Sequence, residues 1–307
     1  MNANQKKGQR EDTIWSALNR AGDEFRAAGV DAPRLTAEVL LAHVLGWERA
    51  RIIAHLHDPL VAAAWEKFRL VARRRASGEP LQYLTGQQEF YGLSFRVTPA
   101  VLIPRPETEI LVEKALTLTR RSRNPVHFVD VGTGSGCIAI SVAHELPAAT
   151  GRATDISAGA LAIAHENAQR LGVHGRVAFV RSDLLECFPP RPLFDLILSN
   201  PPYVAGADVE SLPGLVRNHE PHTALLGGES GLETYRRLIP QAAARLAAPG
   251  HLLLEVGAGQ ARDVAELIRQ AGLVLDEIVE DLQGIPRCII GRRSCAAPEG
   301  EREGHFV

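Results

Sequence analysis

The sequence of 307 residues lacks several features that mark membrane, secreted and metal-binding proteins. No apolar run approaches the ~18 residues that a membrane-spanning helix requires. The N-terminus (residues 1–12) is polar and has no signal-peptide core, so we expect a cytoplasmic protein without membrane contact. The four cysteines show no C-x-x-C spacing, which argues against a disulfide framework and a zinc site. We therefore predict reduced thiols and no bound metal.

The sequence also lacks a large excess of one charge. Its 34 lysines and arginines nearly balance 36 aspartates and glutamates, for a formal net charge of −2. Proteins that hold nucleic acid through a non-specific field usually carry a basic face, so we expect no stable nucleic-acid binding. The one basic run, Arg73-Arg74-Arg75, is expected to be the solvated end of a helix, with docking of a partner as the alternative.

The most informative stretch that is present is Asn200-Pro201-Pro202-Tyr203. It follows an apolar run, residues 194–199, that predicts a buried strand, and its two prolines stop the strand ladder. Open α/β sheets bind ligands at the carboxyl ends of their strands. An asparagine amide beside a tyrosine ring makes a good clamp for a planar –NH2 group, and an Asn-Pro turn that only ends a strand is the alternative.

A glycine-rich turn, Gly132-Thr133-Gly134-Ser135-Gly136, lies between an apolar run at 127–131 and a helical pattern from Ile138. Glycines allow the backbone to pass close to a ligand, and the helix N-terminus presents free N–H groups to a carboxylate or phosphate. A Gly-x-Gly-x-x-Gly dinucleotide fingerprint fails when counted from Gly132. Counted from Gly134 it is weakened, because Ala139 occupies the last position.

Two acidic residues follow the next two predicted strands. Asp155 ends the run 152–155 and could accept the ribose hydroxyls of a nucleoside. Asp183 ends the run 177–183 and could accept from an adenine amino group, with Leu184 against the ring. For each aspartate the alternative is a helix N-cap.

Together these residues resemble the class I S-adenosylmethionine-dependent methyltransferases, and more closely the HemK/PrmC family of release-factor glutamine N5-methyltransferases. The resemblance runs from about Arg34 to Arg287. The glycine turn is common to many methyltransferases, whereas the stretch 103–109 is much more specific. The stretches that carry the resemblance are Gly78-Glu79-Pro80-Leu81-Gln82-Tyr83-Leu84-Thr85-Gly86, Ile103-Pro104-Arg105-Pro106-Glu107-Thr108-Glu109, 130–136, 199–203, His219-Glu220-Pro221 and 281–287.

The resemblance implies a function. S-Adenosyl-L-methionine would be the methyl donor, with S-adenosyl-L-homocysteine as product, and the substrate would be the glutamine of the Gly-Gly-Gln motif in class I peptide chain release factors. Asn200 and the Pro201 carbonyl would accept the two amide hydrogens while Tyr203 stacks on the amide. The alternatives are a ribosomal-protein glutamine, an exocyclic amine of RNA or DNA, and a non-enzymatic binding role.

The predicted architecture is an α/β class I methyltransferase, with a Rossmann-like, doubly wound, seven-stranded sheet. Residues 1–79 are expected to form a helical bundle for substrate recognition, with Trp15, Trp47 and Trp65 as core anchors. Residues 80–104 are expected to form a β-hairpin linker. Residues 105–292 would form the methyltransferase domain, and 293–307 a disordered tail of a monomeric protein. Strands are predicted near 127–131, 151–155, 177–181, 194–199, 251–256, 274–280 and 287–291.

Overall fold

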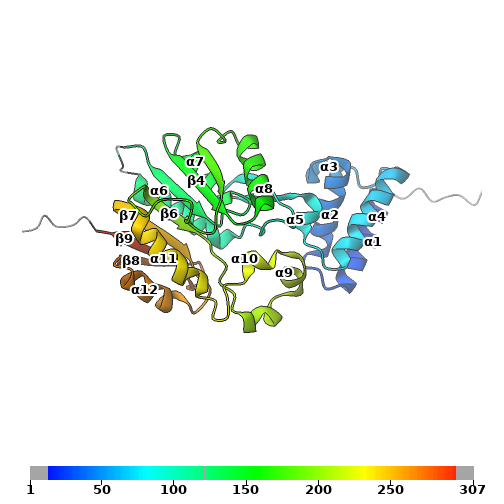
Figure 1. The fold of residues 1–307 in the computed structure, drawn as a ribbon. Helices are drawn as coiled ribbons and strands as arrows, with labels where there is room; N and C mark the ends of the chain where they lie inside the picture. Colours follow the sequence, from blue (N-terminus) through cyan, green and yellow to red (C-terminus); the bar gives the residue numbers. More distant parts are fainter. Residues whose placement is uncertain (1–12, 121, 123, 295–307) are drawn as a thin grey trace, which may run out of the picture. The chain divides into compact units, whose positions relative to one another are not determined.

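The computed structural model describes residues 13–120, 122 and 124–294, and the chain divides into two units at Gly86 (Figure 1). The first, here called the helical unit, ends at Gly86, and the second, the sheet unit, begins at Gln87. Of the predicted tail, residues 295–307 lie outside the described residues, while Arg293 ends the last strand. The roles predicted for the helical unit and the sheet unit stay predictions.

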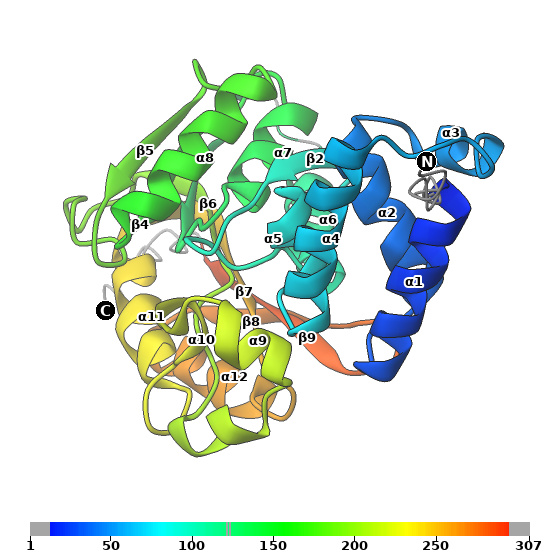
Figure 2. The ribbon, with the colours of Figure 1, turned by 90° about the vertical axis from the view of Figure 1, so that its right-hand side faces the viewer.

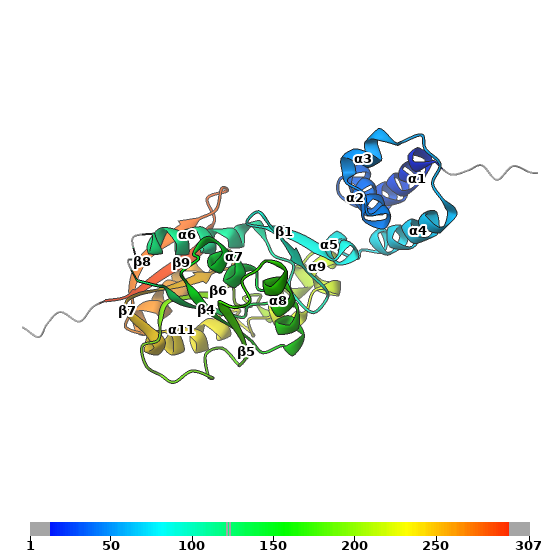
Figure 3. The same cartoon turned by 90° about the horizontal axis from the view of Figure 1, so that it is seen from above.

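The helical unit packs amphipathic helices around one apolar core (Figure 3). Thr13 caps the first helix by accepting from the Ser16 N–H, and Gly46 ends the second in the left-handed conformation at φ 64°. Apolar side chains at helical spacing, such as Leu18 and Phe25, are buried between the helices. The helices are α1 (Ile14–Ala27), α2 (Pro33–Leu45), α3 (Arg49–Ala54), α4 (Ala62–Ala76) and α5 (Leu81–Thr85).

Two expectations for this unit need correction. Trp15 is 46% exposed, because its ring lies under the Arg34 guanidinium at the surface; Trp47 and Trp65 pack against the core as partly buried side chains. The basic run does form the last turn of α4, but its third member, Arg75, is buried and donates to the Glu79 carbonyl oxygen.

The predicted hairpin is shorter than expected. Strands β1 (Gln87–Phe90) and β2 (Leu93–Arg96) pair antiparallel around a tight turn at Tyr91 and Gly92, both with positive φ. The first residues of the predicted hairpin linker form helix α5 instead. Pro80 precedes that helix, where a missing N–H costs nothing, and Tyr83 and Leu84 on its inner side are buried.

The sheet unit is built on the predicted seven-stranded sheet, in the order β5-β4-β3-β6-β7-β9-β8. Strands β3 to β7 run parallel, and β9 pairs antiparallel with both β7 and β8. The predicted strands are confirmed, with β7 and β9 longer than expected. The strands are β3 (His127–Val131), β4 (Thr150–Asp155), β5 (Val177–Arg181), β6 (Phe194–Ser199), β7 (Leu246–Glu255), β8 (Val274–Glu280) and β9 (Pro286–Arg293).

Helices cover both faces of this sheet, as a doubly wound fold requires (Figure 2). Side chains alternate along each strand: Phe128 packs with one set of helices, and Val129 packs with the other. Helices α6 (Glu109–Thr119), α7 (Cys137–Glu145) and α8 (Ala158–Arg170) cover the first face, and α11 (Glu233–Arg245) and α12 (Ala261–Gln270) cover the second. The predicted fold class is confirmed.

Between β6 and α11 the chain makes a long excursion that closes at its own base. Val204 and Leu226 form a bridge, and the Gly227 N–H donates to the Val204 carbonyl oxygen at 2.9 Å. The excursion contains the 3-10 helix η2 (Gly206–Ser211) and the short helices α9 (Gly214–His219) and α10 (His222–Leu225).

Throughout 13–294, residues 121 and 123 aside, the structure has no helix that is long and apolar enough to cross a membrane. Cys137, Cys187 and Cys288 are free thiols, and Cys295 lies outside the described residues.

Candidate active site

A cavity of about 480 Å³ opens at the carboxyl ends of the parallel strands. It lies beside the point between β3 and β6 where the order of the strands reverses. Doubly wound sheets usually bind their ligands at such a point. Seven of the sequence-predicted residues line it: Gly132, Gly134, Asp155, Asp183, Leu184, Asn200 and Pro202. Val101, Ile156 and residues of α10 complete the lining.

The glycine turn keeps its conformation through hydrogen bonds to neighbouring strands. The N–H groups of Gly132 and Thr133 donate to the Thr154 carbonyl oxygen at 2.8 and 2.9 Å. Gly136, at φ 82°, is the N-cap of α7, and this left-handed backbone strains any residue with a Cβ, which would also crowd Ala164 at 3.1 Å, so the position favours glycine. The side chains of Thr133 and Ser135 are buried beneath the turn and do not line the cavity.

Asp130 supports this turn from below, and the sequence analysis did not single it out. Its Oδ2 accepts from the Thr133 hydroxyl at 2.6 Å and from the Ala139 N–H at 3.2 Å. Burial raises the pKa of Asp130 to about 7, against the lowering effect of these two bonds. An aspartate inside a largely apolar strand, two residues before a glycine turn, was the available signal.

Asp155 joins the end of β4 to the glycine turn. Its Oδ2 accepts from the Gly134 N–H and its Oδ1 from the Ser157 N–H, both at 2.9 Å. The N-cap of α8 is Ser157, whose hydroxyl accepts from the Ala160 N–H. Asp155 is therefore not the helix cap that the alternative interpretation required, and its carboxylate lines the cavity.

Asp183 and Leu184 follow β5 at the same edge. Leu184 has a φ of 51°, an uncommon conformation for a residue with a branched side chain. Asp183 Oδ2 accepts from Arg237 Nη2 at 2.6 Å, so one carboxylate oxygen already has a cationic partner. The chain after Asp183 forms a turn rather than a helix, which removes the N-cap alternative.

The Asn200 side chain is held by a buried pair of polar groups. Its Nδ2 donates to Thr108 Oγ1 at 3.1 Å, and the Thr108 hydroxyl donates to Glu255 Oε2 at 2.6 Å. Thr108 ends the 3-10 helix η1 (Pro106–Thr108), and Glu255 ends β7. Thr108 stands in a predicted motif without a predicted role, and Glu255 was not predicted as a site residue.

Pro201 is buried, and Tyr203 packs its ring on the apolar core beneath α11 and α12. Burial raises the pKa of the Tyr203 hydroxyl to about 12. The Tyr203 carbonyl oxygen accepts from Gln260 Nε2 at 2.9 Å, which fixes the turn after the prolines. Neither Pro201 nor Tyr203 lines the cavity of the other predicted residues.

An ion pair connects two of the sequence motifs. Arg105, in the stretch 103–109, pairs with Glu220 of the excursion, and Glu220 is only 3% exposed. Glu220 Oε2 also accepts from the Ile103 N–H at 3.4 Å. The Arg105–Glu220 pair thus holds the excursion against the segment that leads to Thr108.

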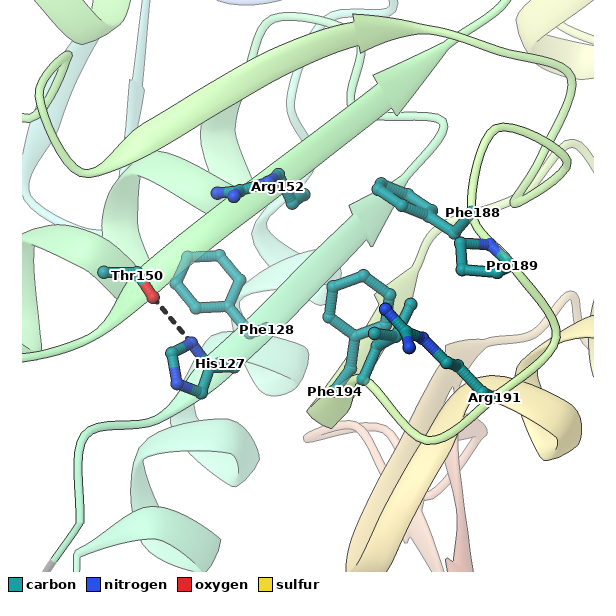
Figure 4. Close-up of a pocket in the computed structure, with 9 residues that line it drawn as sticks. His127, Phe128, Thr150, Arg152, Phe188, Pro189, Arg191 and Phe194 are labelled. Carbon is teal, nitrogen blue, oxygen red and sulfur yellow. Dashed lines mark hydrogen bonds between the residues drawn. The ribbon is translucent and has the colours of Figure 1, made fainter.

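A second hollow, of about 290 Å³, lies at the opposite, amino edge of the same strands (Figure 4). His127 Nδ1 and Thr150 Oγ1 are 2.8 Å apart on its wall, and Phe188 meets Phe194 edge to face. None of the sequence-predicted site residues lines this hollow. The candidate active site is therefore the cavity at the carboxyl edge.

Comparison with known families and structures agrees with this architecture. The PrmC N-terminal domain matches residues 16–86, and the methyltransferase small domain matches residues 107–215. The crystal structure of the hMettl16 catalytic domain in complex with the MAT2A 3'UTR hairpin 6 has a TM-score of 0.53 at 18% identity, over 72% of this chain and 81% of that one. A methyltransferase from Pyrococcus furiosus has a TM-score of 0.50 at 18% identity, over 67% of this chain and 91% of that one. These likenesses show the fold.

Sequence relatives are closer. The release factor glutamine methyltransferase of Moorella thermoacetica is 45% identical over 92% of this chain and 99% of its own length. The proteins of the same name from Bradyrhizobium diazoefficiens and Koribacter versatilis are 42% and 43% identical, each over 92% of this chain and at least 95% of their own length. Identity at this level across nearly the whole chain confirms the family that the motifs predict: the chain belongs to the release factor glutamine methyltransferases.

Proposed function

We propose that this protein transfers a methyl group from S-adenosyl-L-methionine to the side-chain amide nitrogen, N5, of the glutamine in the Gly-Gly-Gln motif of class I release factors. The observation that carries the proposal is the orientation of Asn200. Its NH2 group is turned toward Thr108, which leaves the carbonyl oxygen to accept an amide hydrogen from a substrate. Membership of the release factor glutamine methyltransferases supports the choice of substrate.

The residues at the carboxyl edge fit the proposed cofactor. The cavity of about 480 Å³ falls in the usual range for ligand sites. A Cβ added at Gly132 or Gly134 would meet nothing within 4 Å, so the turn faces open space where a ligand can approach the backbone. Asp155 would accept the ribose hydroxyls, Asp183 the adenine amino group, and Leu184 would pack on the adenine ring. When bound, the cofactor supplies a methyl group already activated on a sulfonium.

The protein's main chemical task is then to position the substrate amide. An amide nitrogen is a poor nucleophile, because its lone pair is delocalised into the carbonyl. Asn200 Oδ1 and the Pro201 carbonyl oxygen would accept its two hydrogens and aim the nitrogen at the methyl group, while Tyr203 would hold the amide plane. Orientation of this kind can supply about 7–11 kcal/mol.

No strong base is required for this transfer. The new N–C bond forms as the C–S bond breaks, the electron pair of that bond returns to sulfur, and the nitrogen, now acidic, loses its proton to water. Tyr203, whose pKa is raised to about 12 by burial, stays neutral and is not a base at neutral pH.

The same clamp explains the choice of glutamine over glutamate. Two acceptors, Asn200 Oδ1 and the Pro201 carbonyl oxygen, suit the two N–H donors of an amide. A carboxylate would leave both acceptors unpaired, which buried sites penalise strongly.

We further propose that the helical unit holds the protein partner, that the enzyme works as a monomer, and that it acts in the cytoplasm beside the translation machinery. The helical unit exposes apolar side chains that a protein partner could cover, among them Trp15, Ile53 and Leu70.

The test is methyl transfer from labelled S-adenosylmethionine to a purified release factor, beside a variant factor with alanine in place of the Gly-Gly-Gln glutamine. We expect label in the unmodified factor only. An Asn200→Ala enzyme should lose roughly 100-fold or more in kcat while its cofactor Kd changes less than about threefold. Label in ribosomal protein or in RNA of whole ribosomes, with none in the release factor, would refute the proposed substrate.

A further inference from the structure

A chain of hydrogen bonds from three distant parts of the sequence ends on Asn200. Glu255 at the end of β7 is 3% exposed, and Thr108 is 2% exposed. The distances along the chain are 2.6 Å from Thr108 Oγ1 to Glu255 Oε2 and 3.1 Å from Asn200 Nδ2 to Thr108 Oγ1. Neither Thr108 nor Glu255 lines the cavity, so each acts on substrate only through Asn200.

The chemistry of Glu255, Thr108 and Asn200 decides which group donates in each of these hydrogen bonds. Above its pKa of about 7, Glu255 is ionised and only accepts, so the Thr108 hydroxyl then donates its hydrogen to Glu255. The Thr108 oxygen is then left as an acceptor, and only the NH2 end of Asn200 can satisfy it. An asparagine amide has nearly the same shape after a half turn, so shape alone cannot distinguish its two ends.

We propose that Thr108 and Glu255 are positioning residues that set the polarity of Asn200. While Glu255 accepts, Asn200 presents its carbonyl oxygen to the substrate; when Glu255 is made to donate, Asn200 turns over and presents its NH2 group. A turned Asn200 places donors against the two N–H donors of the substrate amide and prevents productive binding. This inference rests on the proposed function, because it concerns how Asn200 is oriented to accept a hydrogen from the substrate amide.

The substitution Glu255→Gln should reverse the donor and acceptor roles in this series of hydrogen bonds. Glu255 receives hydrogen bonds from both Thr108 and Asn200, and two carboxylate oxygens can accept both. A glutamine has a single acceptor oxygen, so one of these two donors would face an NH2 group. Turning Asn200 relieves that conflict.

The experiment compares four variants in the release-factor assay: Glu255→Gln, Thr108→Val, Thr108→Ser and the Thr108→Val/Glu255→Gln double variant. Glu255→Gln should lower kcat roughly 10- to 100-fold, the cost of one unpaired buried group, with the cofactor Kd unchanged within about threefold. Thr108→Val removes the link and should also lower kcat. Thr108→Ser retains the hydroxyl and should stay within about threefold of the wild type.

The double variant tests whether Thr108 and Glu255 act together on Asn200, here called the relay, or contribute to kcat independently. Thr108 and Glu255 act on the same Asn200 amide, which can be turned only once. The double variant should therefore lose less activity than the product of the two single losses. Multiplied losses, a Glu255→Gln enzyme with wild-type kcat, or a Thr108→Ser enzyme as slow as Thr108→Val would each overturn the relay. If Glu255→Gln fails to fold, the comparison of Thr108→Ser with Thr108→Val still tests the relay.

A second readout does not depend on the substrate. The side-chain NH2 hydrogens of Asn200 should exchange slowly with solvent in the wild type and in Thr108→Ser, and fast in Thr108→Val, as followed by NMR. Equal exchange in all of these proteins would overturn the relay. A wild-type enzyme that shows the protected signal but never labels a release factor would overturn the proposed function alone.

Discussion

The buried carboxylate of Glu255 should make the protein's stability depend on pH in a way that one substitution removes. Burial raises the pKa of Glu255 from 4.5 to about 7, although hydrogen bonds from Thr108 and Asn200 and the charge of Arg287 lower it. Glu107, facing it from η1, adds to the rise. Below about pH 7 the folded protein therefore holds a proton that the unfolded chain releases near pH 4.5.

The sign follows from that difference in bound protons. A raised pKa contributes stability that is fully present below the unfolded pKa and is lost as the pH rises through about 7. Between pH 5 and pH 8 the loss for this one group is about 2–3 kcal/mol. Glu255→Gln carries no such group, so its free energy of unfolding should exceed the wild-type value by that much more at pH 8 than at pH 5.

The assay is differential scanning calorimetry of the wild type and Glu255→Gln at pH 5, 6, 7 and 8. The difference between the two melting temperatures should grow by roughly 3–6 °C across this range. Any constant cost of placing glutamine at position 255 cancels in the comparison, as does the titration of Asp130, which is present in both proteins. Parallel melting curves would refute the reasoning, because they would mean that Glu255 titrates alike in the folded and unfolded chain.

Three further outcomes follow from the structure. Gly136→Ala should lower the melting temperature by an amount equal to roughly 1–3 kcal/mol and weaken cofactor binding, since the left-handed φ of 82° strains a residue with a Cβ, which would also crowd Ala164 at 3.1 Å; unchanged calorimetry and cofactor titrations would contradict this. Arg105→Ala leaves the Glu220 carboxylate buried without its cation and should cost roughly 3 kcal/mol in urea unfolding, and adding Glu220→Gln should recover part of the loss. Asp155→Ala should weaken cofactor binding roughly 10-fold or more by isothermal titration, and a wild-type Kd would remove Asp155 from the binding site.

The sheet could be predicted from the sequence because its signals are local. Most of the parallel strands are short, largely apolar runs that end in or shortly before Gly, Asp or Asn, and the observed ranges agree with the predicted ones within a few residues, apart from the earlier start of β7. The cavity residues followed from the same logic, because parallel strands bring their carboxyl ends to one edge. Helix α5 and the exposed Trp15 were missed, since apolar residues predict burial without saying which partner covers them.

The polar network around Asn200 could not be predicted in this way. Thr108, Asn200 and Glu255 stand 92 and 55 residues apart along the chain, and only the folded sheet brings them within hydrogen-bond distance. Glu255 looked like the end of an ordinary apolar strand. The ion pair between Arg105 and Glu220 spans a similar separation, although both residues stood in motifs that the sequence analysis had marked.

The self-closing base of the excursion lets part of that segment vary independently of β6. Because Val204 and Leu226 bridge at its entrance, the stretch through η2 and α9, which has no buried residue, can lengthen, shorten or change while the strand end that carries Asn200 stays where β6 leaves it. Exchange of that stretch alone, with Glu220 and α10 retained, is a route by which the scaffold can change the surface beside its catalytic edge without rebuilding the edge itself.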